Sequence, residues 1–394
     1  MTRSKLRRMA LAVAALQVSI LVATAGSAQA RTIWPLYPGG TSMPVALSFS
    51  EPPTTGDLSD RSLLDELKRM IHDSESGDLI RMGIYSVNYQ PLIDEMAAAK
   101  ARGVTIATVG PKANESAALN LALGTNARWC ANPPSGCIAN DSSSLMHAKY
   151  AAFSWAKDPS GIRRQNVTWI SSSNLMDSSG YHAFNDAITT YGDTSLYNKV
   201  VEIWQNMWTG GPYRGVNYFD QSIGRGYVAA PTGQLYASPE QETDLVASAL
   251  SNISGRSNTC WVKVQHNSLS GRGQVTAELR RLKSENCRVQ VLISSITRAM
   301  CTNLRNAGAG QITELRQLPT VLHSKFITFF DGGASWRVLT GSHNLTNSAN
   351  YLNDEFFFRS PNYQPYYDNY STHFNLAWAR GSTAVTATDG QPCL

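Results

Sequence analysis

The sequence has little that would tie the protein to a membrane or to a metal ion. Beyond residue 30, no apolar run is long enough to span a bilayer, which excludes a protein with several membrane spans. It contains no C-x-x-C pair and no close cluster of cysteine and histidine, so a structural zinc site is not indicated. Low-complexity tracts are also missing, and we therefore expect a folded chain throughout its main part.

A strong net charge is also lacking once the N-terminal segment is set aside. The chain has 34 Lys+Arg and 29 Asp+Glu, but residues 1–30 hold four of the basic residues and no acidic residue, which leaves 30 against 29. Nucleic-acid-binding domains usually carry a clear positive excess. This near-neutral balance modestly favours a substrate other than nucleic acid, although a local basic patch is compatible with it.

Residues 1–30 have the pattern of a secretory signal peptide. Four basic residues precede an apolar run from Met9 to Ala25, and Ala28-Gln29-Ala30 is a small-x-small cleavage pattern. The apolar run is too short for a membrane anchor, and no charged stop-transfer segment follows it. We therefore expect a secreted, extracellular protein whose mature part follows residue 30.

Six cysteines remain in this mature part, and an even number in an exported chain indicates three disulfides. Two cysteines enclose a short loop, and two others stand at the starts of two strand-like runs. We expect a disulfide within each of these pairs, which leaves the last two cysteines to bond to each other. The expected pairs are Cys130–Cys137, Cys260–Cys287 and Cys301–Cys393.

The mature chain reads as two copies of one plan. In each copy an apolar strand, an amphipathic helix and a second strand follow one another closely, over 79–109 and over 261–294. This is the pattern of a βαβ unit with parallel strands. We therefore predict an α/β fold of two similar α/β/α half-domains with central mixed, largely parallel sheets. The expected limits are 31–209 and 240–394, and the connection 210–239 is rich in Gly, Pro and Tyr.

Aromatic residues gather just before and within this connection, from Trp204 to Phe219. They could form a lipid-contacting loop, because Trp and Tyr favour the headgroup region of a membrane. We favour ordinary packing between the two halves, since an aromatic run is more often core.

Each half also carries the same order of polar residues. His147-x-Lys149 and His323-x-Lys325 are predicted to lie on strands, where residues two apart project from one face. A small-residue turn with an asparagine follows each pair, and a carboxylate follows each turn. These residues are Ser172 and Asn174 with Asp186 in the first half, and Ser342 and Asn344 with Glu355 in the second. A single H-x-K or S-x-N is a weak signal, but their repetition in matching halves is not explained by chance.

The paired segments resemble the phospholipase D superfamily, whose signature is H-x-K-x4-D followed by G-S-x-N in each of two half-domains. The resemblance covers nearly the whole mature chain and implies one active site at the interface of the halves, on a pseudo-twofold axis. The second half fits better, because the first has Ser171 in place of the signature glycine. The signature aspartates are replaced by Ser154 and Phe330. The tyrosyl-DNA phosphodiesterase branch also lacks this aspartate, which keeps a DNA-directed activity open.

The residue types fit metal-free cleavage of a phosphodiester. Lysine ammonium groups and serine and asparagine donors would bind the non-bridging oxygens. One neutral imidazole would attack phosphorus, and the other, protonated, would give its proton to the leaving alcohol. The resemblance assigns His147 as nucleophile and His323 as acid/base, although the near-symmetry of the site leaves this order open. We expect the catalytic set to be His147, Lys149, Asn174, His323, Lys325 and Asn344, with Ser172 and Ser342 binding substrate.

Each histidine also needs a partner on its second ring nitrogen to fix the tautomer. Asp186 and Glu355 are expected in this supporting role, reaching across the pseudo-twofold axis, and Asp354 competes with Glu355 for it. No cofactor, no metal and no obligate protein partner is implied, and the protein is expected to be a monomer.

The favoured function is a secreted phospholipase D that acts on phospholipid at a membrane or micelle surface, releasing phosphatidate and the head-group alcohol. The covalent intermediate would also allow transfer to another alcohol. The alternative is a secreted, metal-independent nuclease acting on DNA or RNA with the same chemistry. A catalytically inactive binding protein is disfavoured because both His/Lys pairs are present.

Overall fold

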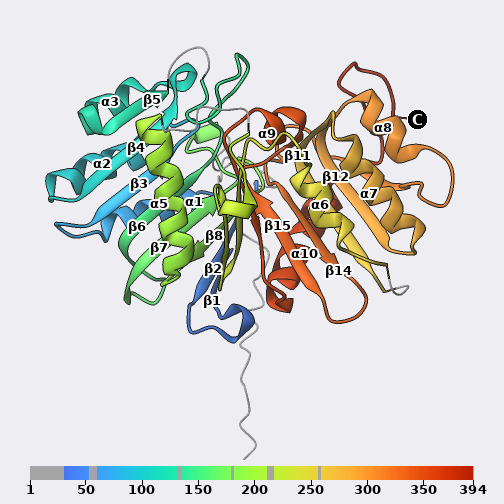
Figure 1. Ribbon diagram of the computed structural model, residues 1–394, viewed down its shortest axis with the longest axis horizontal. Helices are drawn as coiled ribbons and strands as arrows, with labels where there is room; N and C mark the ends of the chain where they lie inside the picture. The colour runs from blue at the N-terminus through green and yellow to red at the C-terminus, as the bar shows by residue number, and fades with distance from the viewer. Residues whose placement is uncertain are drawn as a thin grey trace, which may run out of the picture.

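The computed structural model describes residues 31–393, apart from 53–59, 131–134, 179–181, 211–216 and 256–258. The predicted signal peptide, residues 1–30, lies outside the described residues. Figure 1 shows two α/β halves side by side, the N-terminal half in blue to green and the C-terminal half in yellow to red. In the described part of the chain, no helix combines the length and the apolar character needed to cross a bilayer.

The first half is built on an eight-stranded sheet with the order β1-β2-β8-β7-β6-β3-β4-β5. Its strands are β1 (Arg31–Leu36), β2 (Val45–Ser50), β3 (Leu79–Gly83), β4 (Thr105–Pro111), β5 (Ala127–Cys130), β6 (Tyr150–Lys157), β7 (Arg163–Ser171) and β8 (Asn185–Thr190). Its helices are α1 (Ser62–His72), α2 (Gln90–Ala101), α3 (Ala117–Leu123) and α5 (Thr194–Thr209).

The second half repeats this plan on a sheet with the order β9-β10-β17-β15-β14-β11-β12-β13, and β16 pairs with β11 beside it. Its strands are β9 (Tyr227–Ala230), β10 (Gly233–Ser238), β11 (Trp261–Ser270), β12 (Arg288–Ile296), β13 (Glu314–Gln317), β14 (Phe326–Phe330), β15 (Trp336–Gly341), β16 (Leu345–Thr346) and β17 (Glu355–Arg359). Its helices are α6 (Leu245–Ser251), α7 (Gly273–Ser284), α8 (Arg298–Arg305), α9 (Asn347–Tyr351) and α10 (Gln364–Arg380).

The α/β fold of two similar halves with mixed sheets is therefore confirmed. The parallel part of each sheet is smaller than expected. Among the strands of the described residues, only β3, β4 and β5, and β11, β12, β13 and β16, pair in parallel. The other pairings are antiparallel, since each H-x-K segment starts a meander after its βαβ unit. The second sheet also includes the hairpin β9–β10, which lies within the segment 210–239 that the sequence suggested as a connection.

Local sequence explains where the helices begin and end. Helix α5 begins where the Asp193 side chain accepts a hydrogen bond from Leu196 N, and it ends at Gly210, whose φ of 71° suits glycine. Helix α6 has an aspartate cap as well. Asp244 caps it by accepting from the N–H groups of Val246 and Ala247, so that the helix begins at Leu245.

One hydrophobic cluster spans the interface of the halves. It includes apolar side chains from α5 and α10 and from strands of both sheets. The ring of Tyr150 in β6 stacks on Phe356 in β17, with centroids 4.4 Å apart. Trp204 is 5% exposed and belongs to this cluster, which confirms packing as the role of its part of the aromatic segment, while Tyr213 lies outside the described residues. The interface is thus a shared core that fixes the two halves against each other.

All six cysteines are paired, and the three predicted pairings are confirmed: Cys130–Cys137, Cys260–Cys287 and Cys301–Cys393. Disulfides form and persist mainly in oxidising compartments. The pairing therefore fits an extracellular location, and secretion itself stays a prediction.

Candidate active site

The two H-x-K segments lie immediately before β6 and β14, not on these strands as predicted. Each segment crosses to the opposite half instead. The N–H groups of His147 and Ala148 both donate to Asp354 O at 2.9 Å. In the same way His323 N and Ser324 N donate to Phe184 O, at 3.0 and 2.6 Å. Backbone contacts across the interface thus hold both histidines at the junction of the halves.

His147 pairs with Glu355 of the opposite half. Its Nδ1 lies 2.7 Å from Glu355 Oε1, and the histidine side chain is 12% exposed while that of Glu355 is 1% exposed. Ser342 Oγ donates to the second carboxylate oxygen at 2.5 Å. An Nδ1–H that donates to Glu355 leaves the Nε2 lone pair free. The supporting contact expected of Glu355, across the interface, is therefore present in the structure.

The expected partner of His323 was wrong. Asn185, not Asp186, meets this ring, with His323 Nδ1 at 3.0 Å from Asn185 Oδ1. The amide orientation is set by Asn185 Nδ2, which donates to Ala183 O at 3.2 Å. Asp186 is buried, and its carboxylate accepts hydrogen bonds from Thr340 Oγ1 and Tyr370 Oη.

A one-residue difference in register explains this error. In the first half Ser172 Oγ accepts from the N–H of Asp186, whereas in the second half Ser342 Oγ accepts from the N–H of Phe356. Asp186 therefore corresponds to Phe356, and Asn185 corresponds to Glu355. A shift of one residue turns a strand side chain to the other face of the sheet. The prediction therefore placed the Asp186 carboxylate on the face of β8 toward His323, where the structure has the Asn185 side chain.

Ser172 and Ser342 are also used differently from the prediction. Both side chains are fully buried. The hydroxyl of Ser342 donates to Glu355, and that of Ser172 lies 3.4 Å from Asn185 Oδ1 and 3.3 Å from Asp186 O. A hydroxyl has one proton to donate, so these serines orient the histidine partners, and the predicted direct contact with substrate is not supported.

Lys149 and Lys325 are buried beside the histidines, with exposed fractions of 2% and 1%. Lys325 Nζ donates to His323 O at 2.6 Å, and Lys149 Nζ donates to His147 O. Burial lowers the pKa of Lys325 to about 7, against the opposing effect of Glu355 and Asp186. Burial likewise lowers the pKa of Lys149 well below its usual value. Lys325 Nζ also lies 3.5 Å from Ser172 O and 3.2 Å from His323 Nδ1. The positive charge of both ammonium groups would attract a bound anion.

Asn174 and Asn344 follow Ser172 and Ser342 in the two turns, and their contact with substrate stays a prediction. Among the described residues, the Oδ1 atoms of both amides have no hydrogen-bond partner. Sequence reasoning missed Tyr85, whose ring meets His147 edge-on at 4.5 Å between centroids and lies under Lys149 Nζ at 4.6 Å. No repeat signals this residue, because Tyr85 lies beyond the end of β3, outside the H-x-K and S-x-N segments.

Electrostatics favour neutral histidines in the free site. Burial lowers the pKa of His147 well below its usual value, and Lys149 and Lys325 add to this. Burial does the same for His323, with further lowering by Lys325, Lys149 and His147. Burial raises the pKa of Glu355 to about 8, although Lys149, Ser342 and Lys325 oppose this. Each of these pKa shifts favours the neutral form of the group, whereas a bound anion would favour the protonated forms of the lysines and histidines.

No group of three or more histidine, cysteine, aspartate or glutamate side chains suited to a metal ion occurs in the described part of the chain. The site contains imidazoles, ammonium groups, amides and the carboxyl group of Glu355. These groups suit binding of a phosphate oxyanion and transfer of protons.

A family model described as "Cardiolipin synthase, PLD-like domain" matches residues 252–378, which contain the second H-x-K and S-x-N segments. No curated protein matches the chain by sequence. The matched region lies within the second half of the chain.

Two solved structures share the fold over most of the chain. Polyphosphate kinase from Porphyromonas gingivalis is 15% identical with a TM-score of 0.58, over 88% of this chain and 49% of that one, so this chain spans about half its length. Phosphatidylserine synthase from Haemophilus influenzae is 10% identical with a TM-score of 0.53, over 82% of this chain and 86% of that one. Nuc from Salmonella typhimurium, a phospholipase D family member, is 19% identical with a TM-score of 0.32, over 44% of this chain and 99% of that one.

Proposed function

We propose that this chain, which belongs to the phospholipase D superfamily, is a phosphodiesterase that hydrolyses glycerophospholipids to phosphatidate and a head-group alcohol through a phosphohistidine. One observation carries the proposal: two histidines from opposite halves meet beside two buried lysines, and each has a fixed partner on Nδ1. Attack on phosphorus by one imidazole, with proton transfer to the leaving group by the other, needs this arrangement.

In the first step, Nε2 of His147 attacks phosphorus, and the bond from phosphorus to the head-group oxygen breaks. His323 gives its proton to this oxygen, so that a neutral alcohol leaves. The phosphorylated ring of His147 is cationic, and this charge lowers the pKa of Glu355, whose carboxylate at 2.7 Å stabilises the ring in turn. The amide oxygen of Asn185 stabilises a charged His323 less, which makes His323 the better acid. This asymmetry supports His147 as the nucleophile.

In the second step, His323 takes a proton from water while the water oxygen attacks phosphorus. The bond from phosphorus to His147 Nε2 then breaks, and phosphatidate is released. The lysines and Asn174 and Asn344 would hold the non-bridging oxygens in both steps. The bound phosphate anion offsets the lysine charges and so raises the pKa of His323 in the complex.

A lipid is favoured over nucleic acid as the substrate for two reasons. The mature chain is close to electrical neutrality, whereas affinity for nucleic acid depends largely on neutralising phosphates. The family model that matches the second half is also described by the name of a phospholipid-synthesising enzyme. Single-stranded DNA is the substrate that would show the alternative, so it belongs in the same assay.

Ethanol is expected to divert the product. The proposed intermediate holds the phosphatidyl group after the head group has left, so water and ethanol compete for it. With phosphatidylcholine vesicles in EDTA, the ratio of phosphatidylethanol to phosphatidate should rise in proportion to the ethanol/water ratio. Release of choline should continue meanwhile. The products are separated and quantified by mass spectrometry.

Cleavage of the lipid without any transfer product would contradict the covalent route. Cleavage of single-stranded DNA but not of vesicles would replace the lipid by nucleic acid as substrate. Loss of all activity in EDTA, restored by a divalent ion, would overturn the metal-free mechanism.

The pH profile gives a separate prediction. His323 and Lys325 act in their protonated forms, and burial lowers the pKa of both, that of Lys325 to about 7. We therefore expect kcat/KM, which reports the free enzyme, to fall with rising pH, first below pH 7 as His323 loses its proton and then through about 7 as Lys325 does. Lys325→Arg should make this fall less steep, because arginine stays charged. A kcat/KM that instead rises from pH 7 to pH 8 would contradict these roles.

A further inference from the structure

The carboxylate of Asp354 is held in a cradle of backbone N–H groups from the other half of the chain. Cys137 N and Ile138 N donate to Oδ2 at 2.5 and 3.1 Å, and Ala139 N donates to Oδ1 at 2.9 Å. Asp354 is fully buried. Successive N–H groups that converge in this way form an anion-binding nest.

The backbone of Asp354 also makes hydrogen bonds to the segment that contains His147. Asp354 O accepts hydrogen bonds from the N–H groups of His147 and Ala148, and Asp354 N donates to Leu145 O at 3.0 Å. The next residue is Glu355, which binds His147 Nδ1. Asp354 therefore contacts the segment around His147, the proposed nucleophile, and is bonded directly to Glu355, the partner of His147.

Phe184, the residue at the pseudo-symmetric position in the first half, has no carboxylate to bind such N–H groups. Phe184 O accepts from His323 N and Ser324 N just as Asp354 O accepts from its own pair. The Phe184 side chain, however, packs edge-on against His373 with centroids 5.4 Å apart. The nest is thus confined to the half of the site that holds the pair of His147 and Glu355.

A disulfide shapes the segment that forms the nest. Cys137, the first donor, is bonded to Cys130 at the end of β5. Ser135 O accepts from Met146 N at 3.0 Å, which ties the same segment to the residue before His147. Gly136 lies so close to Ala139 O that an added Cβ would be 2.5 Å from it. The turn is therefore tight, and few other backbone paths would present the same three donors.

We propose that Asp354 is a positioning residue that couples the Cys130–Cys137 disulfide to the pair of His147 and Glu355, so that turnover depends on this bond. Reduction frees Cys137 from β5 and loosens the nest, and Asp354 then no longer fixes the strand that presents Glu355. The inference rests on the proposed function for its activity readout. A second readout, described below, does not depend on the substrate.

Two variants test the coupling in the full exported chain. Asp354→Asn presents an NH2 group to N–H donors, and Cys130→Ser/Cys137→Ser opens the loop. Misplacing a catalytic group by about 1 Å costs about 10²-fold in rate. We therefore expect each variant to lower kcat by about 10- to 100-fold and to change KM by less than about threefold. The combined variant should lose little more than either alone, because both act through the same contact.

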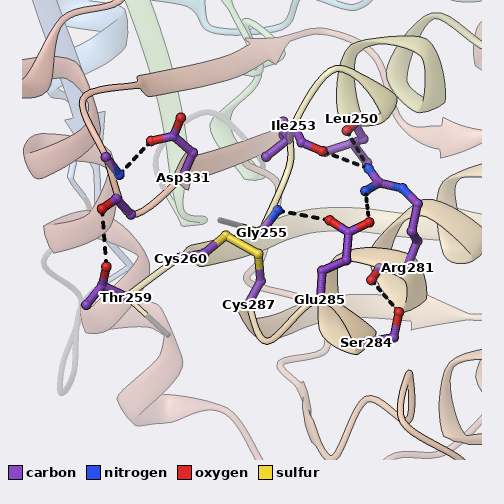
Figure 2. Close-up of a disulfide and its surroundings, with 12 residues drawn as sticks. Leu250, Ile253, Gly255, Thr259, Cys260, Arg281, Ser284, Glu285, Cys287 and Asp331 are labelled. Carbon is purple, nitrogen blue, oxygen red and sulfur yellow. Dashed lines mark hydrogen bonds and ion pairs between the residues drawn. A yellow bond between two sulfur atoms is a disulfide. The ribbon is translucent and has the colours of Figure 1, made fainter. Parts of the chain in front are cut away.

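The Cys260–Cys287 disulfide is the matched control. Figure 2 shows it beside Arg281, Glu285 and Gly255, and no residue of the proposed active site is drawn around it. It joins residues 27 apart, against 7 for the first pair. The loop-entropy argument predicts more stabilisation for the longer loop. Cys260→Ser/Cys287→Ser should therefore lower Tm more than Cys130→Ser/Cys137→Ser and leave kcat within about threefold.

A nuclear magnetic resonance readout separates this inference from the function. The Nδ1 proton between His147 and Glu355 should give a downfield resonance in the wild type and in the Cys260/Cys287 control. This resonance should be absent from the spectra of Asp354→Asn and of Cys130→Ser/Cys137→Ser. Unchanged resonance and kcat in these two variants would overturn the coupling, as would strictly additive losses. If the wild type cleaves no phosphodiester, the proposed function fails, and the resonance alone decides the positioning role.

Discussion

We expect His147→Ala and His323→Ala each to lower kcat on the natural substrate by about 10⁴-fold or more. Without His147 no group can take up the phosphatidyl moiety, and without His323 the leaving alkoxide receives no proton. Initial rates of head-group release measure the effect.

The two variants should differ on a substrate with a good leaving group. A p-nitrophenyl phosphodiester needs little protonation of its leaving oxygen. His323→Ala should therefore release one equivalent of p-nitrophenol and stall as the phosphohistidine, whereas His147→Ala should show no burst. The reverse result would exchange the two roles. His72→Ala, at a side chain that is 67% exposed, is the control and should keep the wild-type rate.

The sequence was most informative where the chain repeats itself. Strand–helix–strand patterns and the paired H-x-K and S-x-N segments recur, so that two similar halves were predictable from this repetition. The active site at their interface was implied by the resemblance to the phospholipase D superfamily. The cysteine pairs followed from short loop length and from the starts of neighbouring strands. Local hydrophobic periodicity and repetition carry this kind of information.

The contacts between the halves were not predictable in the same way. Asn185 was overlooked because a carboxylate stands next to it, and only the strand register shows which of the two residues faces His323. The role of Asp354 depends on three N–H groups more than 200 residues away in the chain. Backbone donors have no sequence signature, since every residue except proline has one.

A buried ion pair beneath the second half of the site provides the other large expected effect. The Arg272 side chain is fully buried, and its Nε donates to Asp244 Oδ2 at 2.5 Å while Nη2 donates to Oδ1. Asp244 also caps α6, and Arg272 Nη1 donates to Thr346 O at 3.2 Å, two residues after Asn344. The pair therefore joins a helix cap to the turn that presents a proposed phosphate ligand.

Replacing Arg272 with methionine fills a similar volume but leaves Asp244 charged and buried without its partner. Breaking one side of such a pair costs about 3–5 kcal/mol, because an uncompensated charge remains in the interior. We expect denaturant unfolding of Arg272→Met to show a loss of stability of this size. Activity at temperatures where the variant is folded should also fall, since the turn holding Asn344 loses a contact.

The exposed pair of Arg298 and Asp389 is the matched control, with side chains 55% and 46% exposed and a separation of 2.6 Å. Exposed ion pairs contribute at most about 1 kcal/mol, because water solvates each charge when the other is removed. Arg298→Met should therefore stay within that limit of the wild type. Equal losses in the two variants would mean that burial does not set the strength of the Arg272 contact. A loss below about 1 kcal/mol in Arg272→Met would mean that water reaches Asp244 once the guanidinium is gone.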